Sequence, residues 1–165
     1  MPSTYSATFS GTSFAGVSVS AAQDLFSMLA AETVPFMLNR LSISTSGQTT
    51  PGNLVISVQR FTPTVTQGSG GTVVAASSLA EIAQYAQRTP TTVVHTNDAT
   101  QRASTTGSKE LIWTGTVQDL NNLDDIPIPE LWPFVPGNCA LIIGLETAPA
   151  AAVVLYGSAQ FTELT

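Results

Sequence analysis

The chain has 165 residues, of which 10% are charged, and it carries a formal net charge of −6 with a pI near 4.4. This length predicts a single domain. The acidic balance argues against a nucleic-acid partner, because phosphate contacts need clustered Lys and Arg. Soluble domains average about 25% charged residues. The low value here indicates broad uncharged surface, which is usually packed against something, often copies of the same chain.

Two residue types that occur only once exclude several kinds of covalent and metal site. Cys139 is the single cysteine and His95 the single histidine, so the sequence offers no intrachain disulfide, no Cys-x-x-Cys motif and no His-rich metal site. The first six residues have neither the basic region nor the apolar run of a signal peptide, and we expect none. The longest strongly apolar run, 139–145, is far shorter than the ~20 residues of a membrane helix. We therefore expect no membrane partner.

Most of the chain is typical of short β-strands separated by turns. In segment 36–45, Leu41 and Ile43 alternate with polar residues, and segment 54–61 alternates in the same way. Such alternation predicts strands with one packed and one solvated face. The first two strands are expected to pair with each other around Ser10. The expected strands are 6–9, 14–19, 24–29, 36–45, 54–61, 91–96, 110–117, 139–145 and 153–161.

One segment has the pattern of a helix. Ser78, followed three residues later by Glu81, forms a capping box, and Thr89 with Pro90 ends the segment. The helix is about eight or nine residues long, short enough to be a lid or corner piece. Its apolar stripe consists of Leu79, Ile82, Ala83, Tyr85 and Ala86.

Together these elements predict an all-β chain: a jelly-roll-like two-sheet β-sandwich of about eight strands with one short helix. No change of composition divides the sequence, so a single domain over residues 1–165 is expected. Segment 1–16 is polar with few apolar anchors, and we expect it to be an N-terminal arm that reaches a neighbouring molecule.

The densest acidic group lies in the second half of the chain. Oxygen ligands at close spacing suit Ca²⁺, and paired carboxylates suit glycoside hydrolysis. However, the spacing is not that of an EF-hand, and a solvated loop accounts for the same residues. We predict no cofactor, no metal and no catalytic residue, while calcium binding here stays open. The group consists of Asp119, Asp124, Asp125 and Glu130.

Three further features have ordinary structural explanations. His95 lies in mid-strand, and the sequence contains no Gly-x-Ser-x-Gly motif to pair with it, so a structural or interface role is favoured. Cys139 opens an apolar strand and is expected to be a buried, inert thiol. The glycine-rich stretch 67–71 lacks the Gly-Lys-Ser/Thr ending of a phosphate loop, which favours a flexible connection.

Aromatic residues are the remaining candidates. Exposed rings can stack on sugars, but Trp132, between prolines, is typical of an anchor that pins a loop or plugs a neighbouring subunit. The rings considered for sugar stacking are Trp113, Trp132, Tyr85 and Tyr156. The residues expected at an interface are Tyr5, Phe9, Phe14, Tyr85, Trp132 and Phe134.

Both ends of the sequence resemble a known family. Residues 5–9 are Tyr-Ser-Ala-Thr-Phe, and residues 17–26 are Val-Ser-Val-Ser-Ala-Ala-Gln-Asp-Leu-Phe. This opening is similar to that of small proteins encoded in the structural gene clusters of tailed phages and prophages. A strand ending near Arg60, the glycine-rich stretch and the Ala-Pro-Ala turn at 148–150 also fit that pattern. The Pro-rich loop 127–137 departs from it.

The resemblance implies a jelly-roll virion protein that decorates, or cements, a capsid. Such proteins sit as trimers on the outer face of the assembled head, bound to the major capsid protein. A protein that binds the assembled shell and not its separated subunits stabilises the shell by mass action, and a trimer adds avidity. We therefore expect a non-enzymatic homotrimer on the outer capsid surface, made in the host cytoplasm. No functional residue is carried over.

Two other functions remain open from the sequence. A glycan-binding head-fibre or tail-tip module would use Trp113 and Trp132 with the long loops. A carboxylate-based hydrolase would use Asp124 or Asp125.

Overall fold

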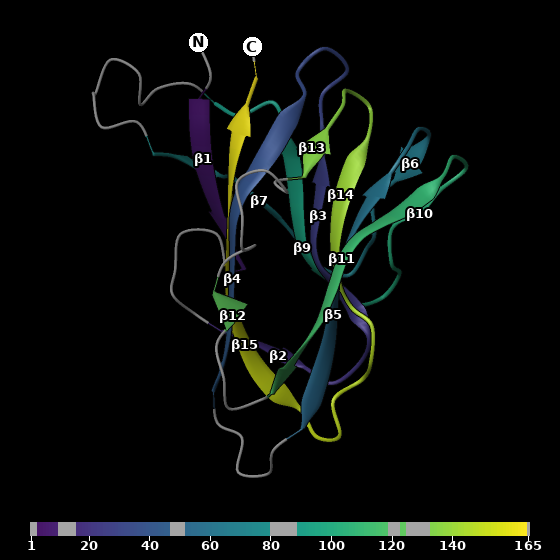
Figure 1. The fold of residues 1–165 in the computed structure, drawn as a ribbon. Helices are drawn as coiled ribbons and strands as arrows, with labels where there is room; N and C mark the ends of the chain where they lie inside the picture. Colours follow the sequence, from purple (N-terminus) through teal and green to yellow (C-terminus); the bar gives the residue numbers. More distant parts are fainter. Residues whose placement is uncertain are drawn as a thin grey trace.

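The computed structural model describes residues 3–9, 16–46, 52–79, 89–118, 123–124 and 133–164. Two large antiparallel sheets face each other as a β-sandwich (Figure 1), which confirms the predicted fold class. The described residues contain no helix, and thus none long and apolar enough to cross a membrane. The predicted helix falls on 80–88, outside the described residues, and Ser78 ends a short strand.

The first sheet has seven strands, with the order β12-β4-β15-β1-β8, and β13 and β2 pair with β4 and β15. Its two longest strands, β4 and β15, pair over almost their full length. The strands are β1 (Ser3–Thr8), β2 (Val17–Val19), β4 (Phe36–Ser46), β8 (Ser77–Ser78), β12 (Leu123–Asp124), β13 (Phe134–Val135) and β15 (Val153–Glu163).

The second sheet has six strands, with the order β11-β5-β14-β3-β9-β7. A separate two-stranded ribbon, called the outer ribbon below, consists of β6 and β10. The strands of the sheet are β3 (Gln23–Leu29), β5 (Asn53–Phe61), β7 (Thr72–Val74), β9 (Val93–Asp98), β11 (Lys109–Gln118) and β14 (Ala140–Leu145), and those of the ribbon are β6 (Val65–Thr66) and β10 (Ser104–Thr105).

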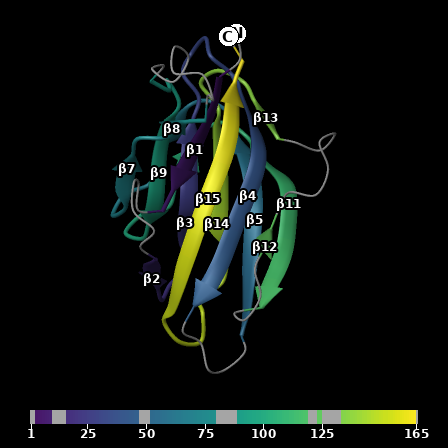
Figure 2. The ribbon, with the colours of Figure 1, turned by 90° about the vertical axis from the view of Figure 1, so that its left-hand side faces the viewer.

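The connectivity gives the sandwich its jelly-roll character. The chain passes from β4 in one sheet to β5 in the other, and from β14 back to β15. Because β4 pairs with β15 and β5 pairs with β14, two paired strands wrap together from sheet to sheet. On their other sides β15 pairs with β1 and β14 with β3, so the last two strands are central to their sheets (Figure 2).

The main core lies between the sheets and follows the alternation in the sequence. Leu54, Ile56 and Val58 of β5 are buried in it. From the first sheet, the ring of Phe161 packs 5.5 Å from that of Tyr5 and 5.6 Å from that of Phe36, measured between centroids. These three rings join neighbouring strands β1, β15 and β4 at one end of the sandwich.

Strands β3 and β14 are buried on both faces; β14 is accordingly apolar throughout, whereas β3 also buries Gln23, Asp24 and Ser27. A second, smaller cluster lies on the outer face of the sheet, where the outer ribbon covers it. It consists of Phe61, Ala103, Ala140 and Ile142, with Leu29 and Val65 packed against it. The outer ribbon therefore protects the apolar back of the six-stranded sheet.

Two expectations for the N-terminus are wrong. Strands β1 and β2 do not form a hairpin, because both pair with β15, β1 along residues 158–163 and β2 along 153–155. Residues 3–8, part of the expected arm 1–16, form a strand of this chain's own sheet, since inward-facing Tyr5 and Ala7 supply the apolar anchors. Residues 10–15 lie outside the described residues.

The buried carboxylate of Glu163 ties the end of β15 to the turn before β9. Its Oε1 accepts hydrogen bonds from the backbone nitrogens of Thr91 and Thr92, at 2.8 and 2.7 Å, and from both hydroxyls, at 3.0 and 2.8 Å. Four donors on one oxygen compensate for burying the side chain, which is 3% exposed.

Substituting Glu163→Ala is therefore expected to lower the free energy of unfolding by about 2 kcal/mol, because it leaves the buried Thr92 amide and the partly buried Thr91 amide without their acceptor. Glu163→Gln keeps an oxygen at the same place and should lose clearly less. Urea denaturation of the two variants measures the difference. Equal stability of both variants and the wild type would contradict this role.

Candidate functional site

The densest group of charges in the described chain lies on the outer face of the six-stranded sheet. Arg102, in the loop before β10, is placed between two carboxylates. Its Nε donates to Asp24 Oδ1 on β3 at 2.7 Å, and its Nη1 and Nη2 each donate to Glu146 at 2.9 Å. Asp24 is 1% exposed and its second oxygen accepts from the Ala103 amide at 2.6 Å.

Two side chains of β5 complete this polar cluster, which we define as Asp24, Arg102, Glu146, Ser57 and Gln59. The Ser57 hydroxyl donates to Glu146 Oε1 at 2.5 Å, and Gln59 Nε2 donates to the same oxygen at 3.1 Å. The hydrogen bonds from Arg102 lower the pKa of Glu146 to about 2, and in turn Glu146 raises the pKa of Arg102.

The cluster clamps the loop before β10 onto the sheet. An adjoining cleft of about 190 Å³ is also lined by Phe61 and Lys109, whose ammonium lies 4.8 Å from the centre of the Phe61 ring. Arg102 already donates to both carboxylates of the cluster, and Glu146 stays ionised near neutral pH. Its carboxylate is therefore suited to holding Arg102, not to exchanging protons with a substrate.

Acid is expected to weaken this clamp. Because the pKa of Glu146 is about 2 in the folded protein and 4.5 for the ordinary group, its ionised form stabilises the fold above about pH 4.5. That contribution should disappear as the pH falls from 4.5 towards 2. Urea midpoints of the wild type and Glu146→Gln, measured across this range, should converge at low pH. A constant gap between the two proteins would contradict the assignment.

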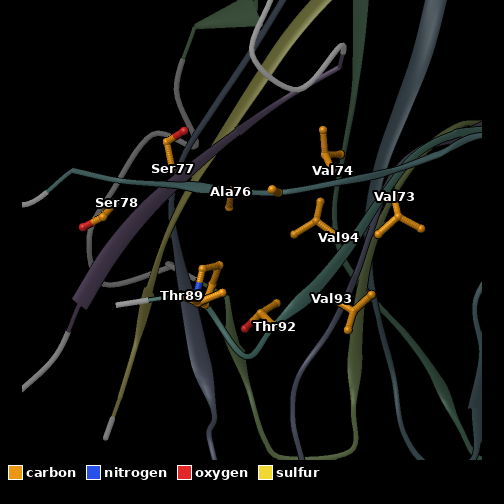
Figure 3. Close-up of a pocket in the computed structure, with 11 residues that line it drawn as sticks. Val73, Val74, Ala76, Ser77, Ser78, Thr89, Thr92, Val93 and Val94 are labelled. Atoms are coloured by element: carbon orange, nitrogen blue, oxygen red, sulfur yellow. The ribbon is translucent and has the colours of Figure 1, made fainter. Parts of the chain in front are cut away.

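A second feature is a hollow of about 780 Å³ where the chain passes from β7 to β8, at one edge of the sandwich (Figure 3). None of its described lining residues is charged. Val73 on β7 is 64% exposed and Val93 on β9 is 42% exposed, and both line the hollow. We call these two residues the edge patch. Exposed apolar groups gathered in this way mark sites of contact with other molecules.

The structure divides the six residues expected at an interface. Tyr5 and Phe9 are 1% and 2% exposed and belong to the main core, so their assignment to an interface is wrong. Both face inward: the Tyr5 ring packs on Phe161, and the ring of Phe9, which follows β1, lies 4.7 Å from that of Phe26 on β3 in the opposite sheet. Phe134, on β13, is 43% exposed and remains a candidate. The other three lie outside the described residues: Phe14, Tyr85 and Trp132.

Of the acidic group, Asp124 lies in β12, where only its backbone is described, and Asp119, Asp125 and Glu130 lie outside the described residues. Within the part of the chain that the structure describes, no three His, Cys, Asp or Glu side chains are grouped so that they could hold a metal ion. Calcium binding by the acidic group is therefore still a question for experiment.

The remaining candidate residues differ in how far they are buried. Cys139 is buried as predicted, and burial raises the pKa of its thiol. Trp113 is partly buried and packs against the main core, with its ring against Gly115. It is therefore not an open platform for a sugar. Tyr156 is 38% exposed. His95 is partly buried beside Asp98.

The polar cluster was not predicted from the sequence. Arg102 is 78 residues from Asp24 and 44 from Glu146, so no local spacing connects them. The one available signal is an Asp in the mostly apolar strand 24–29, because a buried charge needs a partner. That signal does not identify the partner.

Comparisons with known proteins give little support for any assignment. No protein-family model matches the sequence, and no curated protein is similar to it. Two solved chains were found, described as structures of infectious bursal disease virus strains Gx and Gt. They are 14% and 12% identical to this chain, with TM-scores of 0.17 and 0.13. The alignments cover 98% and 99% of this chain but about two fifths of each viral chain, 42% and 40%. At these scores neither similarity carries an argument about fold or function.

Proposed function

We propose that this protein is a non-enzymatic component of a virus particle: a decoration, or cement, protein that binds the major capsid protein on the outer face of an assembled phage head. The observation that carries the proposal is the edge patch, an exposed uncharged surface on a sandwich whose core is otherwise filled. Homotrimer formation, the absence of nucleic-acid and membrane partners, and synthesis in the host cytoplasm belong to the same proposal.

The physical argument rests on how such a surface is used. Val73 and Val93 expose apolar groups to water, and covering them with another protein is favourable. The described lining of the hollow has no charge to select a charged ligand. A broad, uncharged contact repeated in each subunit of a trimer suits a protein that gains its affinity from several weak contacts at once.

The experiment is to add the purified protein to undecorated, expanded phage capsids and to measure both binding and the heat resistance of the particles. We expect saturable binding with a rise in the temperature of capsid disruption. Failure to bind, or binding without any gain in heat resistance, would count against the proposal. Mass measurement in solution should give about three times the chain mass of 17.2 kDa.

A pair of variants tests the edge patch itself. Val73→Asp places a charge on the exposed apolar surface and should weaken capsid binding or trimer formation. Thr72→Asp adds the same charge to the neighbouring residue of β7, whose side chain points to the opposite face of the strand. Equal loss of binding in both variants would show that charge alone, and not the edge patch, is responsible.

The structure gives no specific support to the glycan-binding alternative. Trp113, one of the two tryptophans proposed for sugar stacking, packs against the core. An array of host glycans remains the direct test of that alternative, and reproducible binding would favour it.

A further inference from the structure

A buried carboxylate outside the polar cluster lacks the partners that such groups normally have. Asp98 ends β9 and is 1% exposed, and neither of its oxygens has a partner at ordinary hydrogen-bond distance and angle; the nearest donors are the Gly71 amide and the His95 ring. Buried charges are costly unless they are paired or hydrogen-bonded. Burial raises the pKa of this group. The groups that surround Asp98 determine how the cost of burying its carboxyl group is offset.

The covering element is the glycine-rich stretch 67–71, which we call the glycine loop. A Cβ added to Gly68 or to Gly71 would lie 2.7 Å from an oxygen of Asp98, so the loop backbone lies directly on the carboxylate. The loop is tied down by the Ser69 amide, which donates to the Gln101 carbonyl at 2.9 Å, and by Gln67 Nε2, which donates to the Ser27 carbonyl at 2.9 Å.

The titratable and charged groups around Asp98 come from three elements. On its own strand, His95 Nδ1 lies 3.7 Å from Oδ1. On the neighbouring strand β3, Asp24 is its direct register partner. The loop that follows β9 contributes Arg102, which is already committed to Asp24 and Glu146. The glycine loop and β7 contain no titratable side chain.

These neighbours favour one proton on the pair formed by His95 and Asp98. With that proton, the pair is either two neutral groups or an ion pair, and both forms suit a covered site. Without it, Asp98 is a bare buried anion facing a second carboxylate, Asp24, whose arginine is already engaged. Uncovering Asp98 to water then becomes the way to relieve the charge.

We propose that the pair of His95 and Asp98 holds one proton, on one group or the other, beneath the glycine loop, and that loss of this proton releases the loop from the outer face of the six-stranded sheet. The inference is independent of the proposed role on a capsid. The covered state binds the proton more tightly than the open state, so the loop is held at low pH and loosens as the pH rises.

The test is amide hydrogen exchange between about pH 5 and pH 9, expressed as protection factors so that the intrinsic effect of pH is removed. The reporting amides are those of Ser69, Thr100 and Gln101, which form the hydrogen bonds between the glycine loop and the chain after β9. Their protection should fall by up to about tenfold per pH unit over part of this range. The Leu38 amide, bonded to the Pro133 carbonyl at 3.1 Å elsewhere in the fold, serves as the internal control.

Variants decide between the proposed pair and other causes. Asp98→Asn, an isosteric neutral change, should abolish the pH dependence, whereas Glu110→Gln, at an exposed carboxylate, should leave it unchanged. If Asp98→Asn does not fold, His95→Gln still tests the idea, because Asp98 alone binds the proton less tightly than the pair and the midpoint should move to lower pH. Constant protection in the wild type, an unchanged fall in Asp98→Asn or an unmoved midpoint in His95→Gln would each overturn the proposal.

Discussion

Substituting Arg102→Met is expected to lower the free energy of unfolding by about 3 kcal/mol at neutral pH. Removing one partner of a buried ion pair costs about 3–5 kcal/mol because the other charge is left uncompensated. Here Asp24, which is 1% exposed, would keep a hydrogen bond from the Ala103 amide but lose the one from Arg102. The lower end of the range applies because the Arg102 side chain is itself 36% exposed.

Arg60, on β5, offers the comparison, since it pairs with Glu110 at the edge of the same sheet. The Glu110 side chain is 55% exposed, and exposed pairs of this kind contribute about 0–1 kcal/mol. Glu110→Gln should therefore be nearly neutral in the urea experiment that measures Arg102→Met. If both variants lose the same small amount, Arg102 is an ordinary surface charge and the clamp does not exist.

Substituting Phe161→Ala is the second large effect, with an expected loss of about 3–5 kcal/mol. The Phe161 ring is fully buried and lies between the rings of Tyr5 and Phe36. Its removal leaves a cavity that three neighbouring strands of a sheet cannot readily close, because their register fixes their spacing. The lost contacts hold β1 and β4 to β15.

Tyr156→Ala is the matched control for that experiment, because Tyr156 lies on the same strand but is 38% exposed. Loss of this partly exposed ring should cost less than about 1 kcal/mol. Thermal unfolding of the two variants should therefore separate clearly. A small effect of Phe161→Ala would mean that the end of the sandwich formed by β1 and β15 adds little to its stability.

The predicted strands agree closely with the observed ones where alternation or an apolar run is strong. Segments 36–45, 54–61 and 153–161 correspond to β4, β5 and β15, each within about two residues at either end. The weakest predictions were the connections. No strand was expected in segments 62–76 and 97–108, yet they contain the outer ribbon and β7. Strands of two or three residues are too short for a periodic pattern, and their pairing partners set them.

The sequence predicted the orientation of the aromatic side chains less well than it predicted the strands. Tyr5 and Phe9 were expected to contact a partner, but they face the core, where Tyr5 packs on Phe161 and Phe9 on Phe26 of the opposite sheet. Alternation divides a strand into two faces without showing which face another layer will cover. Phe134, by contrast, is exposed on a two-residue strand at the edge of the sheet.

The amino-acid sequence by itself determined that this chain is built from strands and that they form a two-layer sandwich, since period-two alternation and turn residues act over neighbouring positions. Only the tertiary structure decided which charges meet: Asp24 with Arg102 and Glu146, and His95 with Asp98 beneath the glycine loop. The polar cluster joins residues far apart in the chain, and the position of the glycine loop over Asp98 depends on how the connections fold back onto the sheet. Contacts of this kind follow from sheet order and register, which local patterns do not specify.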